Sequence, residues 1–415
     1  MARPLQSMFT RPALNSRLRR CCTNSCCQHI RQPFKVSTGR NSQPNPATIR
    51  AYNSVRLSSE SSSISGLFGT RQYRSRFFTQ AAWSFQEPKS ASIVATLADA
   101  PKEYLKYPLP DDCKLLRLPD GRHMAYAEYG SKARDAHPFI FIHGIPDTRL
   151  DACLLRSDKA IAERLNIRWI GIDRPGIGLS TFHPGRTVLG WVNDLEHLID
   201  RLGLTQYRIF SVSGGTPYAL ACAKLLPREN LLSVGIAMGV GPKEAGKAGL
   251  SKLNRIGLSI WEKHPWFFRF ILDRYVAPKV HQESCEKTRR IVRQSTKYMT
   301  KHDQEAFSGE EVFQGLVSIT REVYRQGSSR GYVEDSKLAT GYWGYELHDV
   351  GYEGVRLFYG KWDVNTPPAL GRYMAARLPN ALLKEYAGKS HFTMWDHSEE
   401  MLLDMMKESK TPEDI

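Results

Sequence analysis

Apolar and polar positions after residue 100 alternate between a spacing typical of strands and one typical of helices. Short apolar runs at 115–118 and 123–129 flank a Pro-Asp-Gly turn, which predicts a hairpin. Longer continuous apolar runs predict strands covered on both faces at 137–143, 167–172, 207–212 and 231–238. Helical spacing separates these strands at 150–165 and 191–202. The alternation predicts an α/β fold with a mostly parallel, doubly wound sheet.

The alternation stops between residues 242 and 338, where the pattern becomes helical and rich in charged and aromatic side chains. It then resumes, with strands expected at 355–359 and 381–386 and helices at 369–378 and from 396 onward. We therefore expect an α/β core made of residues 100–241 and 339–415, interrupted by a helical insertion over residues 242–338. The aromatic side chains at its start either fill the insertion's own core or face an apolar substrate or a membrane: Trp261, Trp266, Phe267, Phe268 and Phe270.

The first 95 residues differ from the rest in composition. They are rich in Arg, Ser, Gln and Asn, contain no acidic residue before Glu60, and lack the apolar stretch of a secretory signal. This composition predicts a disordered basic segment that resembles a transit peptide and directs the protein to the mitochondrion. A cytoplasmic protein with a basic tail remains the alternative.

The net charge of +16 is concentrated in that segment. Residues 1–100 hold 14 Lys and Arg against 3 acidic residues, whereas the remainder holds 44 against 39. The body of the protein therefore gives no indication of a nucleic-acid partner. Its longest apolar run, at 231–240, is too short for the roughly 18 residues of a transmembrane helix. We predict no transmembrane segment; a peripheral membrane contact stays open, and the sequence does not indicate an oligomeric state.

A candidate nucleophile lies at the sharpest break in the pattern. The apolar run 207–212 ends at Ser213-Gly214-Gly215, and an Ala- and Leu-rich helical pattern follows. A nucleophile elbow needs small residues two before and two after its nucleophile, and here these are Ser211 and Gly215. Because Ser211 replaces the first glycine of Gly-x-Ser-x-Gly, a glycine-rich turn with an incidental serine remains the structural alternative.

A serine hydroxyl needs a base, and the base needs a carboxylate to orient it. His391 follows the last expected strand, at the sheet edge where Ser213 also lies, whereas His397 falls in the helical pattern beyond it. Asp363 follows the preceding strand in a turn-rich loop. We predict Ser213, Asp363 and His391 as the catalytic residues.

The negative charge that develops on the substrate oxygen needs hydrogen-bond donors. We expect these to be the backbone N–H groups of Gly214, next to the nucleophile, and Ile145, in the loop after the strand at 137–143. His143, Asp173 and Arg174 are expected to brace the neighbouring loops.

Together these residues resemble the α/β-hydrolase superfamily of the serine-nucleophile type, over about residues 112–409. The resemblance rests on His143-Gly-Ile-Pro146, on Asp173-Arg-Pro-Gly-Ile-Gly178, on the Ser213 elbow, on Gly360-x-x-Asp363 and on His391. It implies an esterase- or lipase-like enzyme in which residues 242–338 form a helical cap over the active site.

The identity of the nucleophile restricts the chemistry. The His-Gly-x-Pro loop also resembles epoxide hydrolases, but those use an aspartate, whose ester intermediate water can cleave. A serine would form an ether and turnover would stop. Ser213 therefore predicts hydrolysis of an acyl bond in a small, apolar substrate, most simply a carboxylic ester; a thioester, a lactone and an amide stay open. No metal or organic cofactor is implied.

Two other functions remain possible at this stage. His391 and Asp396 have the His-x4-Asp spacing of lipid acyltransferases, although a helix N-cap after the histidine loop gives the same spacing by chance. The fold also occurs in binding proteins without catalytic activity, and an intact Ser, Asp and His set argues against such a role.

Overall fold

The computed structural model describes residues 94–95, 99–154 and 156–407. The predicted transit-peptide-like segment 1–95 lies outside these residues, apart from its last two, which form strand β1. Within the described part, no helix has the length and apolar character needed to cross a bilayer.

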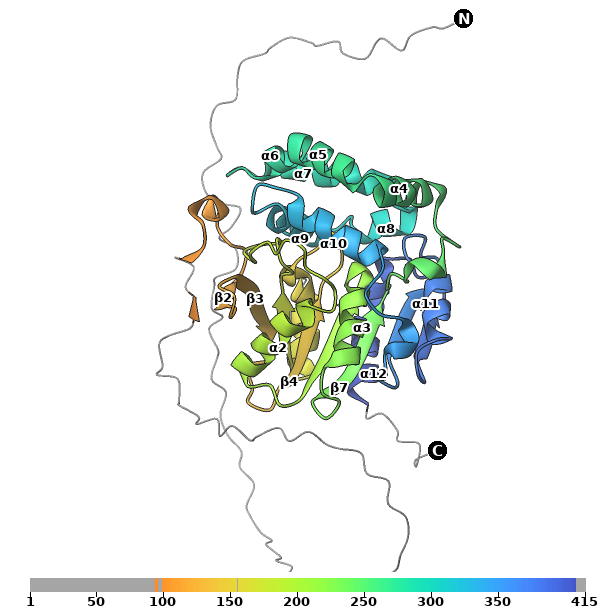
Figure 1. Cartoon of the computed structure of the whole chain (residues 1–415). Coiled ribbons are helices and arrows are strands. Elements are labelled where there is room, and N and C mark those ends of the chain that lie inside the picture. Colours follow the sequence, from red (N-terminus) through yellow and green to blue (C-terminus); the bar gives the residue numbers. More distant parts are fainter. Residues whose placement is uncertain (1–93, 96–98, 155, 408–415) are drawn as a thin grey trace, which may run out of the picture. The chain divides into compact units, whose positions relative to one another are not determined.

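A nine-stranded sheet forms the centre of the described part, in the order β1-β2-β3-β5-β4-β6-β7-β8-β9 (Figure 1). Its strands are β1 (Val94–Ala95), β2 (Lys114–Arg117), β3 (His123–Gly130), β4 (His137–Ile142), β5 (Ile167–Ile172), β6 (Tyr207–Val212), β7 (Leu231–Ala237), β8 (Arg356–Gly360) and β9 (Leu382–Tyr386). β1, β2 and β3 pair antiparallel, as do β3 and β5, and every pairing from β5 to β9 is parallel. The predicted mostly parallel sheet and its leading hairpin are confirmed.

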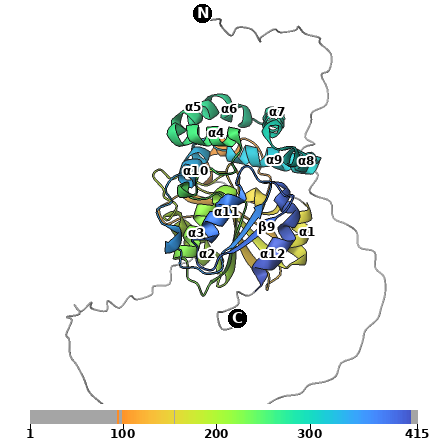
Figure 2. The ribbon, with the colours of Figure 1, turned by 90° about the vertical axis from the view of Figure 1, so that its right-hand side faces the viewer.

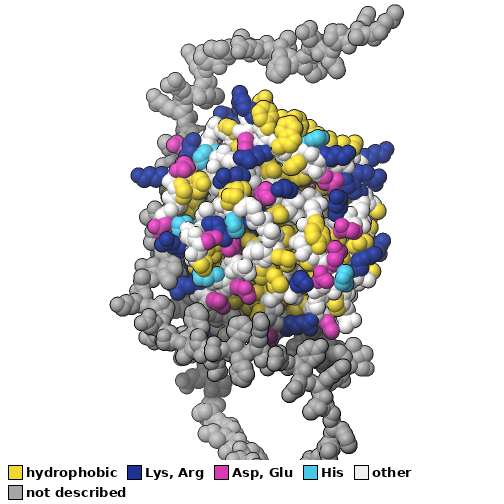
Figure 3. Space-filling model, viewed as in Figure 1, with side chains coloured by type: hydrophobic (Ala, Val, Ile, Leu, Met, Phe, Trp, Pro, Cys, Tyr) yellow, Lys and Arg dark blue, Asp and Glu magenta, His cyan; other side chains and the backbone are white. Residues whose placement is uncertain are grey.

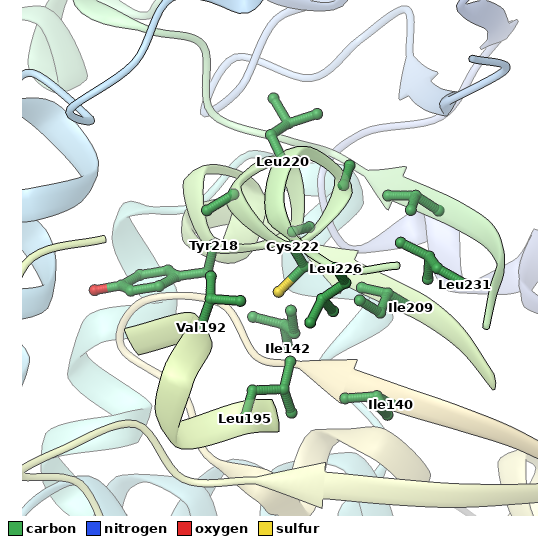
Figure 4. Packing of buried hydrophobic residues seen from close by; sticks show 14 of the residues in the cluster. Ile140, Ile142, Val192, Leu195, Ile209, Tyr218, Leu220, Cys222, Leu226 and Leu231 are labelled. Carbon is green, nitrogen blue, oxygen red and sulfur yellow. The ribbon is translucent and has the colours of Figure 1, made fainter. Parts of the chain in front are cut away.

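Helices cover both faces of this sheet. The core helices are α1 (Arg156–Arg164), α2 (Trp191–Leu202), α3 (Thr216–Leu225), α11 (Pro368–Ala375) and α12 (Ser398–Met406). α2, α3 and α11 pack on one face, and α1 and α12 pack on the other. Figure 4 shows the interlocking side chains of the first face, drawn from β4, β6, β7, α2 and α3.

Strand β4 shows why both faces are covered. Ile140 and Ile142 point into the cluster beneath α2 and α3, whereas Phe139 and Phe141 point into the cluster beneath α1 and α12. Successive side chains of a strand alternate between faces, so a continuous apolar run needs an apolar layer on each side. The apolar runs of the sequence therefore report the layers directly.

The helix expected at 150–165 differs in the structure. A short 3₁₀ helix, η3 (Arg149–Cys153), precedes α1 and is separated from it. The side chain of Arg149 is fully buried and binds Asp111 at 2.6 Å and Asp173 at 2.5 Å. These ion pairs hold the start of the segment against the loop after β5. The helical spacing of apolar residues therefore runs through 150–165, although the backbone does not form one continuous helix there.

A helical insertion lies between β7 and β8, at the edge of the sheet where the parallel strands end (Figures 1 and 2). Its helices are α4 (Lys252–Lys263), α5 (Pro265–Tyr275), α6 (Ala277–Val280), α7 (Glu286–Ser295), α8 (Lys301–Ala306), α9 (Glu310–Val323) and α10 (Arg330–Thr340). In both views α8, α9 and α10 lie next to the sheet, and α4 to α7 form an outer layer.

Buried ion pairs join the inner layer of the insertion to the core. Asp335 of α10 binds Arg174 at 2.9 Å and also pairs with Arg186. Glu322 of α9 binds the guanidinium of Arg149 at 2.9 Å. All of these side chains are buried, so the contacts are not screened by solvent. The inner layer is therefore fixed to the loops that follow β4 and β5.

Candidate active site

Ser213 lies at a sharp turn between strand and helix. β6 ends at Val212, the 3₁₀ helix η4 (Ser213–Gly215) follows, and α3 begins at Thr216. Ser213 has a φ of 47°, a left-handed conformation that non-glycine residues seldom adopt and that is frequent at active sites. Its carbonyl accepts hydrogen bonds from Thr216 Oγ1 at 2.8 Å and from the N–H of Val240 at 3.1 Å. These bonds fix the turn and leave the hydroxyl at the carboxyl end of β6.

The small residues around Ser213 are a steric necessity. A Cβ on Gly215 would lie 2.6 Å from the carbonyl oxygen of Ile142 and 2.8 Å from Ser211 Oγ. The hydroxyl of Ser211 is buried and has no hydrogen-bond partner among the described residues. Serine therefore fits at position 211, where the usual motif has glycine, because residue 215 is a glycine and has no Cβ to meet the Ser211 hydroxyl. The departure from the motif leaves the turn intact.

Asp363 lies three residues beyond β8, in a tight turn. Its Oδ1 accepts backbone N–H groups from Asn365 at 2.7 Å and Thr366 at 2.8 Å, and the hydroxyl of Thr366 lies 2.9 Å from its Oδ2. The carboxylate is 2% exposed. Hydrogen bonds of this kind fix the direction of the second oxygen.

That oxygen is directed at His391, in the loop after β9. His391 Nδ1 lies 2.7 Å from Asp363 Oδ2 and 3.0 Å from the hydroxyl of Thr366. Since a carboxylate only accepts, Nδ1 carries the hydrogen in the neutral ring, and Nε2 is left to accept a proton. The structure thus brings together two of the three predicted residues by a direct bond.

The third predicted residue, Ser213, shares the sheet edge with this pair. β6, β8 and β9 are parallel members of one sheet, so the segments after them emerge on the same side. Within the described part of the chain, no hydrogen bond joins Ser213 to His391. Sheet topology thus places Ser213 and His391 at one edge of the sheet, and a direct bond between them stays a prediction.

Acidic groups on three elements raise the pKa of His391 above its usual value. Burial alone lowers this pKa, but the negative charges of Asp363, Asp303 and Asp151 outweigh it, and Asp363 has the largest effect. They come from the loop after β8, from α8 and from η3. A base of this kind loses its proton only at a higher pH than an isolated histidine does.

Asp303 also holds the histidine loop in place. Its Oδ1 accepts the hydroxyl of Ser390 at 2.6 Å and the N–H of Phe392 at 3.0 Å, so it grips both neighbours of His391. Its Oδ2 accepts the hydroxyl of Thr300 at 2.7 Å. The side chain is 1% exposed, although it belongs to the insertion. The insertion therefore helps to position the candidate base.

The loop after β4 packs against the Ser213 turn. A Cβ on Gly144 would lie 3.4 Å from the Ser213 Cβ, and one on Gly214 would lie 2.5 Å from the side chain of Ile145. Among the backbone hydrogen bonds of the described loops and turns, none uses the N–H of Ile145. The loop that carries Ile145 thus packs against the turn that carries Gly214, and donation by their N–H groups to a substrate oxygen stays a prediction.

Arg174 and His143 stabilise this loop from behind. The guanidinium of Arg174 donates to the carbonyl oxygens of His143 and, at 2.8 Å, Gly144. His143 Nδ1 lies 2.8 Å from the Gly144 carbonyl, and Nε2 accepts the N–H of Arg174 at 3.2 Å. Burial, together with the charge of Arg174, holds the pKa of His143 well below its usual value. A neutral, fully buried ring in these contacts has a structural role.

Two contributors to this site, Thr366 and Asp303, do not follow from the sequence reasoning. Thr366 had a usable signal, because Asp-x-Asn-Thr-Pro predicts a turn in which the aspartate accepts nearby N–H groups. Asp303 had none, since it lies 88 residues before His391 and meets it only through the packing of the insertion. Neither contributes to the cavity of about 100 Å³ near Tyr342 and Trp343, which lies away from these residues.

The sheet order, the helices on both faces, the left-handed serine after β6 and the acid and histidine after β8 and β9 define an α/β-hydrolase fold. The chain resembles a hydrolase from Pseudomonas aeruginosa PA01, with a TM-score of 0.50, 16% identity and coverage of 71% of this chain and 98% of that one. It also resembles MGS-M2, an α/β hydrolase from a Medee basin deep-sea metagenome library, with a TM-score of 0.50, 16% identity and coverage of 72% and 100%. The sequence matches no protein-family model and no curated protein, so the likeness rests on the fold.

Proposed function

We propose that the protein is a serine hydrolase that cleaves an acyl bond, most simply a carboxylic ester. The observation that carries the proposal is the strained turn at Ser213, which has a φ of 47°. It lies at the same edge of the sheet as Asp363 and His391, a buried pair whose Oδ2 and Nδ1 atoms are 2.7 Å apart. A left-handed serine is maintained at an energetic cost, and such strain is usually retained where a side chain must be presented for chemistry.

In this mechanism Nε2 of His391 accepts the hydroxyl proton of Ser213 as its oxygen attacks the substrate carbonyl carbon. Asp363 holds the ring through Nδ1 and stabilises the imidazolium. The N–H groups of Ile145 and Gly214 donate to the carbonyl oxygen as it becomes negative. The imidazolium then protonates the leaving alcohol, which departs and leaves an acyl-enzyme. Water, deprotonated by His391, attacks that ester and restores Ser213.

An acyl substrate follows from the nucleophile. Attack by a serine oxygen on a carbonyl gives an ester that water can reopen, whereas attack on an epoxide would give a stable ether. Thioesters, lactones and amides share the acyl chemistry.

The structure gives no support to the alternative of an acyltransferase that uses a His-x4-Asp motif. Asp396, which completes the spacing from His391, has a side chain that is 63% exposed and pairs with Lys389 at 2.7 Å. Asp396 is therefore one partner of a surface ion pair near the start of the last helical segment. Transfer of the acyl group to another alcohol would therefore have to proceed through Ser213, as hydrolysis does.

The test is covalent labelling of the full-length protein by a fluorescent fluorophosphonate, beside Ser213→Ala and Ser211→Ala variants. Ser211 is a matched control, because it is two residues away and its buried hydroxyl has no partner among the described residues. We expect labelling of the wild type and of Ser211→Ala and none of Ser213→Ala. A folded wild type that is not labelled would overturn the proposal and favour a binding protein. Labelled protein would then be assayed on p-nitrophenyl esters of increasing chain length.

We also propose, from composition alone, that residues 1–95 direct the protein to mitochondria. A fluorescent fusion of the full chain should colocalise with mitochondria, and one that begins at residue 96 should not. Equal cytoplasmic distribution of both fusions would favour the alternative of a cytoplasmic protein.

A further inference from the structure

The outer layer of the insertion has an apolar surface that no element of the described chain covers. Fourteen large hydrophobic side chains are exposed in the described part, and seven of them lie within residues 253–275. They are between 40% and 67% exposed. We call them the outer apolar face: Leu253, Ile256, Ile260, Trp266, Phe267, Phe270 and Tyr275. Large exposed apolar patches on monomers usually mark contact sites.

The spacing of these residues gathers most of them on one side of each helix. Leu253, Ile256 and Ile260 follow one another at three and four positions, so they share one side of α4. On α5, Phe270 comes four residues after Trp266 and therefore lies beside it. The apolar side chains thus lie along two consecutive helices of the outer layer.

The inner side of the same helices is already satisfied. Trp261 of α4 stacks on Phe268 of α5 with ring centres 4.7 Å apart, and on Tyr332 of α10 at 5.6 Å. The two sequence-based interpretations of these aromatics therefore apply to different residues. Trp261 and Phe268 belong to the core of the insertion, whereas Trp266, Phe267 and Phe270 face away from it.

Positive charge surrounds this face. The same helices and α6 carry six exposed basic side chains: Lys252, Arg255, Lys263, Arg269, Arg274 and Lys279. The two acidic residues in this stretch are already paired, Glu262 with Lys247 at 2.7 Å and Asp273 with Arg269 at 3.3 Å. Figure 3 shows yellow apolar side chains among dark blue basic ones over the top of the molecule, where α4 to α7 lie.

We propose that the outer apolar face docks on a lipid bilayer with anionic headgroups. Helices with aromatic and aliphatic residues on one side and Lys and Arg beside them lie in the membrane interface, with apolar side chains among the acyl chains and cations among the phosphates. A second copy of this chain fits less well, because a two-fold contact would set one basic surface against another.

Docking in this way would bring the candidate site close to the lipid. Asn254, on the inner side of α4, donates to the carbonyl of Val364 at 3.0 Å and to Asn365 Oδ1 at 2.7 Å. These residues belong to the loop that holds Asp363. The helix that carries the apolar face is thus bonded directly to the loop of the candidate acid. The docking itself needs no catalysis and is tested without it.

The experiment measures binding of the full-length protein to vesicles made of equal parts of phosphatidylglycerol and phosphatidylcholine, and to vesicles of phosphatidylcholine alone. Residues 1–100, with 14 Lys and Arg against 3 acidic residues, attract anionic vesicles by themselves. Cosedimentation alone is therefore not decisive. The local readout is quenching of tryptophan fluorescence by lipids with brominated acyl chains.

Two tryptophans that are exposed in the described part of the chain give a matched pair for this readout. Trp266 is 67% exposed and lies on the outer apolar face, whereas Trp362 is 52% exposed and lies in the loop after β8. In a Trp83→Phe background, which removes the tryptophan of the basic segment, we expect quenching by brominated anionic vesicles that persists in Trp362→Phe and is lost in Trp266→Phe. Quenching lost in Trp362→Phe instead, or absent from the wild type, would overturn the proposal.

Binding is then compared between Ile256→Ser, Phe270→Ser and the control Leu403→Ser. Leu403 is 44% exposed on α12, at the opposite end of the described molecule (Figure 1). Each substitution on the apolar face should weaken binding about tenfold, and Leu403→Ser should not. Arg255→Gln should weaken it about fivefold on anionic vesicles only. Equal effects of all variants, or a face that proves by light scattering to be buried in a dimer, would refute docking on lipid.

Discussion

Replacing Asp303 by asparagine tests whether the insertion takes part in catalysis. Asparagine has the same shape, so its Oδ1 can still accept Ser390 Oγ and the Phe392 N–H, which lie at 2.6 and 3.0 Å in the native protein. Its amide nitrogen replaces Oδ2 and can donate to the hydroxyl of Thr300. The substitution therefore removes the negative charge and keeps the geometry.

The effect on the pH profile follows from the sign of that charge. His391 must be neutral to act as a base, so activity rises with pH through its pKa. Asp303, like Asp363 and Asp151, raises this pKa by favouring the imidazolium. Its removal lowers the pKa of His391, and the acid limb of kcat/KM should move to lower pH in Asp303→Asn.

Comparing Asp303→Asn with Asp303→Ala separates the effect of the Asp303 charge from the effect of its hydrogen bonds to the histidine loop. Hydrogen bonds to charged groups contribute about 1.5–3 kcal/mol and neutral ones about 1, so Asp303→Asn should lose about 2 kcal/mol of unfolding free energy over its two bonds to the histidine loop. Asp303→Ala leaves the Phe392 N–H without its partner and leaves the Ser390 hydroxyl with Thr393 Oγ1 alone, at 2.9 Å, at a cost of about 3–5 kcal/mol. Because it also frees the loop, we expect its kcat to fall about 100-fold with little change in KM.

Asp273→Asn is the matched control. Asp273 also belongs to the insertion and accepts a backbone N–H and a hydroxyl, both from Ser329, at 2.6 and 2.8 Å. It belongs to α5, and its bonds go to residues 328 and 329, just before α10, and to Arg269 rather than to the histidine loop. The assay is the pH dependence of fluorophosphonate labelling and of ester hydrolysis, with thermal unfolding in parallel. An acid limb that stays in place in Asp303→Asn, or that moves equally in Asp273→Asn, would refute the positioning role.

Three further substitutions test the site and its surroundings. Gly215→Ala would place a Cβ 2.6 Å from the carbonyl of Ile142, so we expect a loss of about 3 kcal/mol by denaturant unfolding and little soluble protein; wild-type stability would contradict the steric account. Thr366→Val removes the hydroxyl 2.9 Å from Asp363 Oδ2, and kcat of ester hydrolysis should fall about tenfold with KM unchanged; a change confined to KM would point to substrate contact instead. Asp335→Asn leaves two buried guanidinium groups uncompensated and should cost about 3–5 kcal/mol. Burial raises the pKa of Asp335, but Arg174 and Arg186 outweigh this effect and lower the pKa to about 2. The stabilisation by this carboxylate should therefore be present above pH ~4 and be lost as the pH falls through about 2. Asp335→Asn should lack this acid-unfolding step.

The sheet could be predicted from the sequence because its strands are short, continuous apolar runs. The run at 167–172 coincides with β5, and the run at 207–212 coincides with β6. Both strands are covered on two faces, and this burial makes every position apolar. The helix expected at 150–165 failed for the opposite reason. Its first residues are held by the ion pairs of Arg149, which no local periodicity reports.

The residues of the candidate site also fall into those that local sequence patterns predict and those that depend on long-range packing. Ser213, Asp363 and His391 could be singled out because each lies just after a strand, and topology collects such positions at one edge of the sheet. The Asp363–His391 contact agrees with this reasoning, whereas the bond from His391 to Ser213 stays a prediction. Asp303 was not found, because its approach to the histidine loop depends on how a separate set of helices packs on that edge.

That packing has a consequence for how the insertion could move. Its inner layer is tied to the core by buried charges, Asp335 with Arg174 and Glu322 with Arg149, and separating either pair would leave charge in a low-dielectric interior. The outer layer contacts α10 through the ring of Trp261 and through Asp273 of α5, a partly exposed carboxylate that accepts the N–H of Ser329 at 2.6 Å. Separating these contacts does not leave a charge in the interior. Any opening of the insertion should therefore involve α4 and α5, the helices that carry the outer apolar face, at the cost of the hydrogen bonds of Asn254 and Asp273 but of no buried ion pair, while α9 and α10 stay with the sheet.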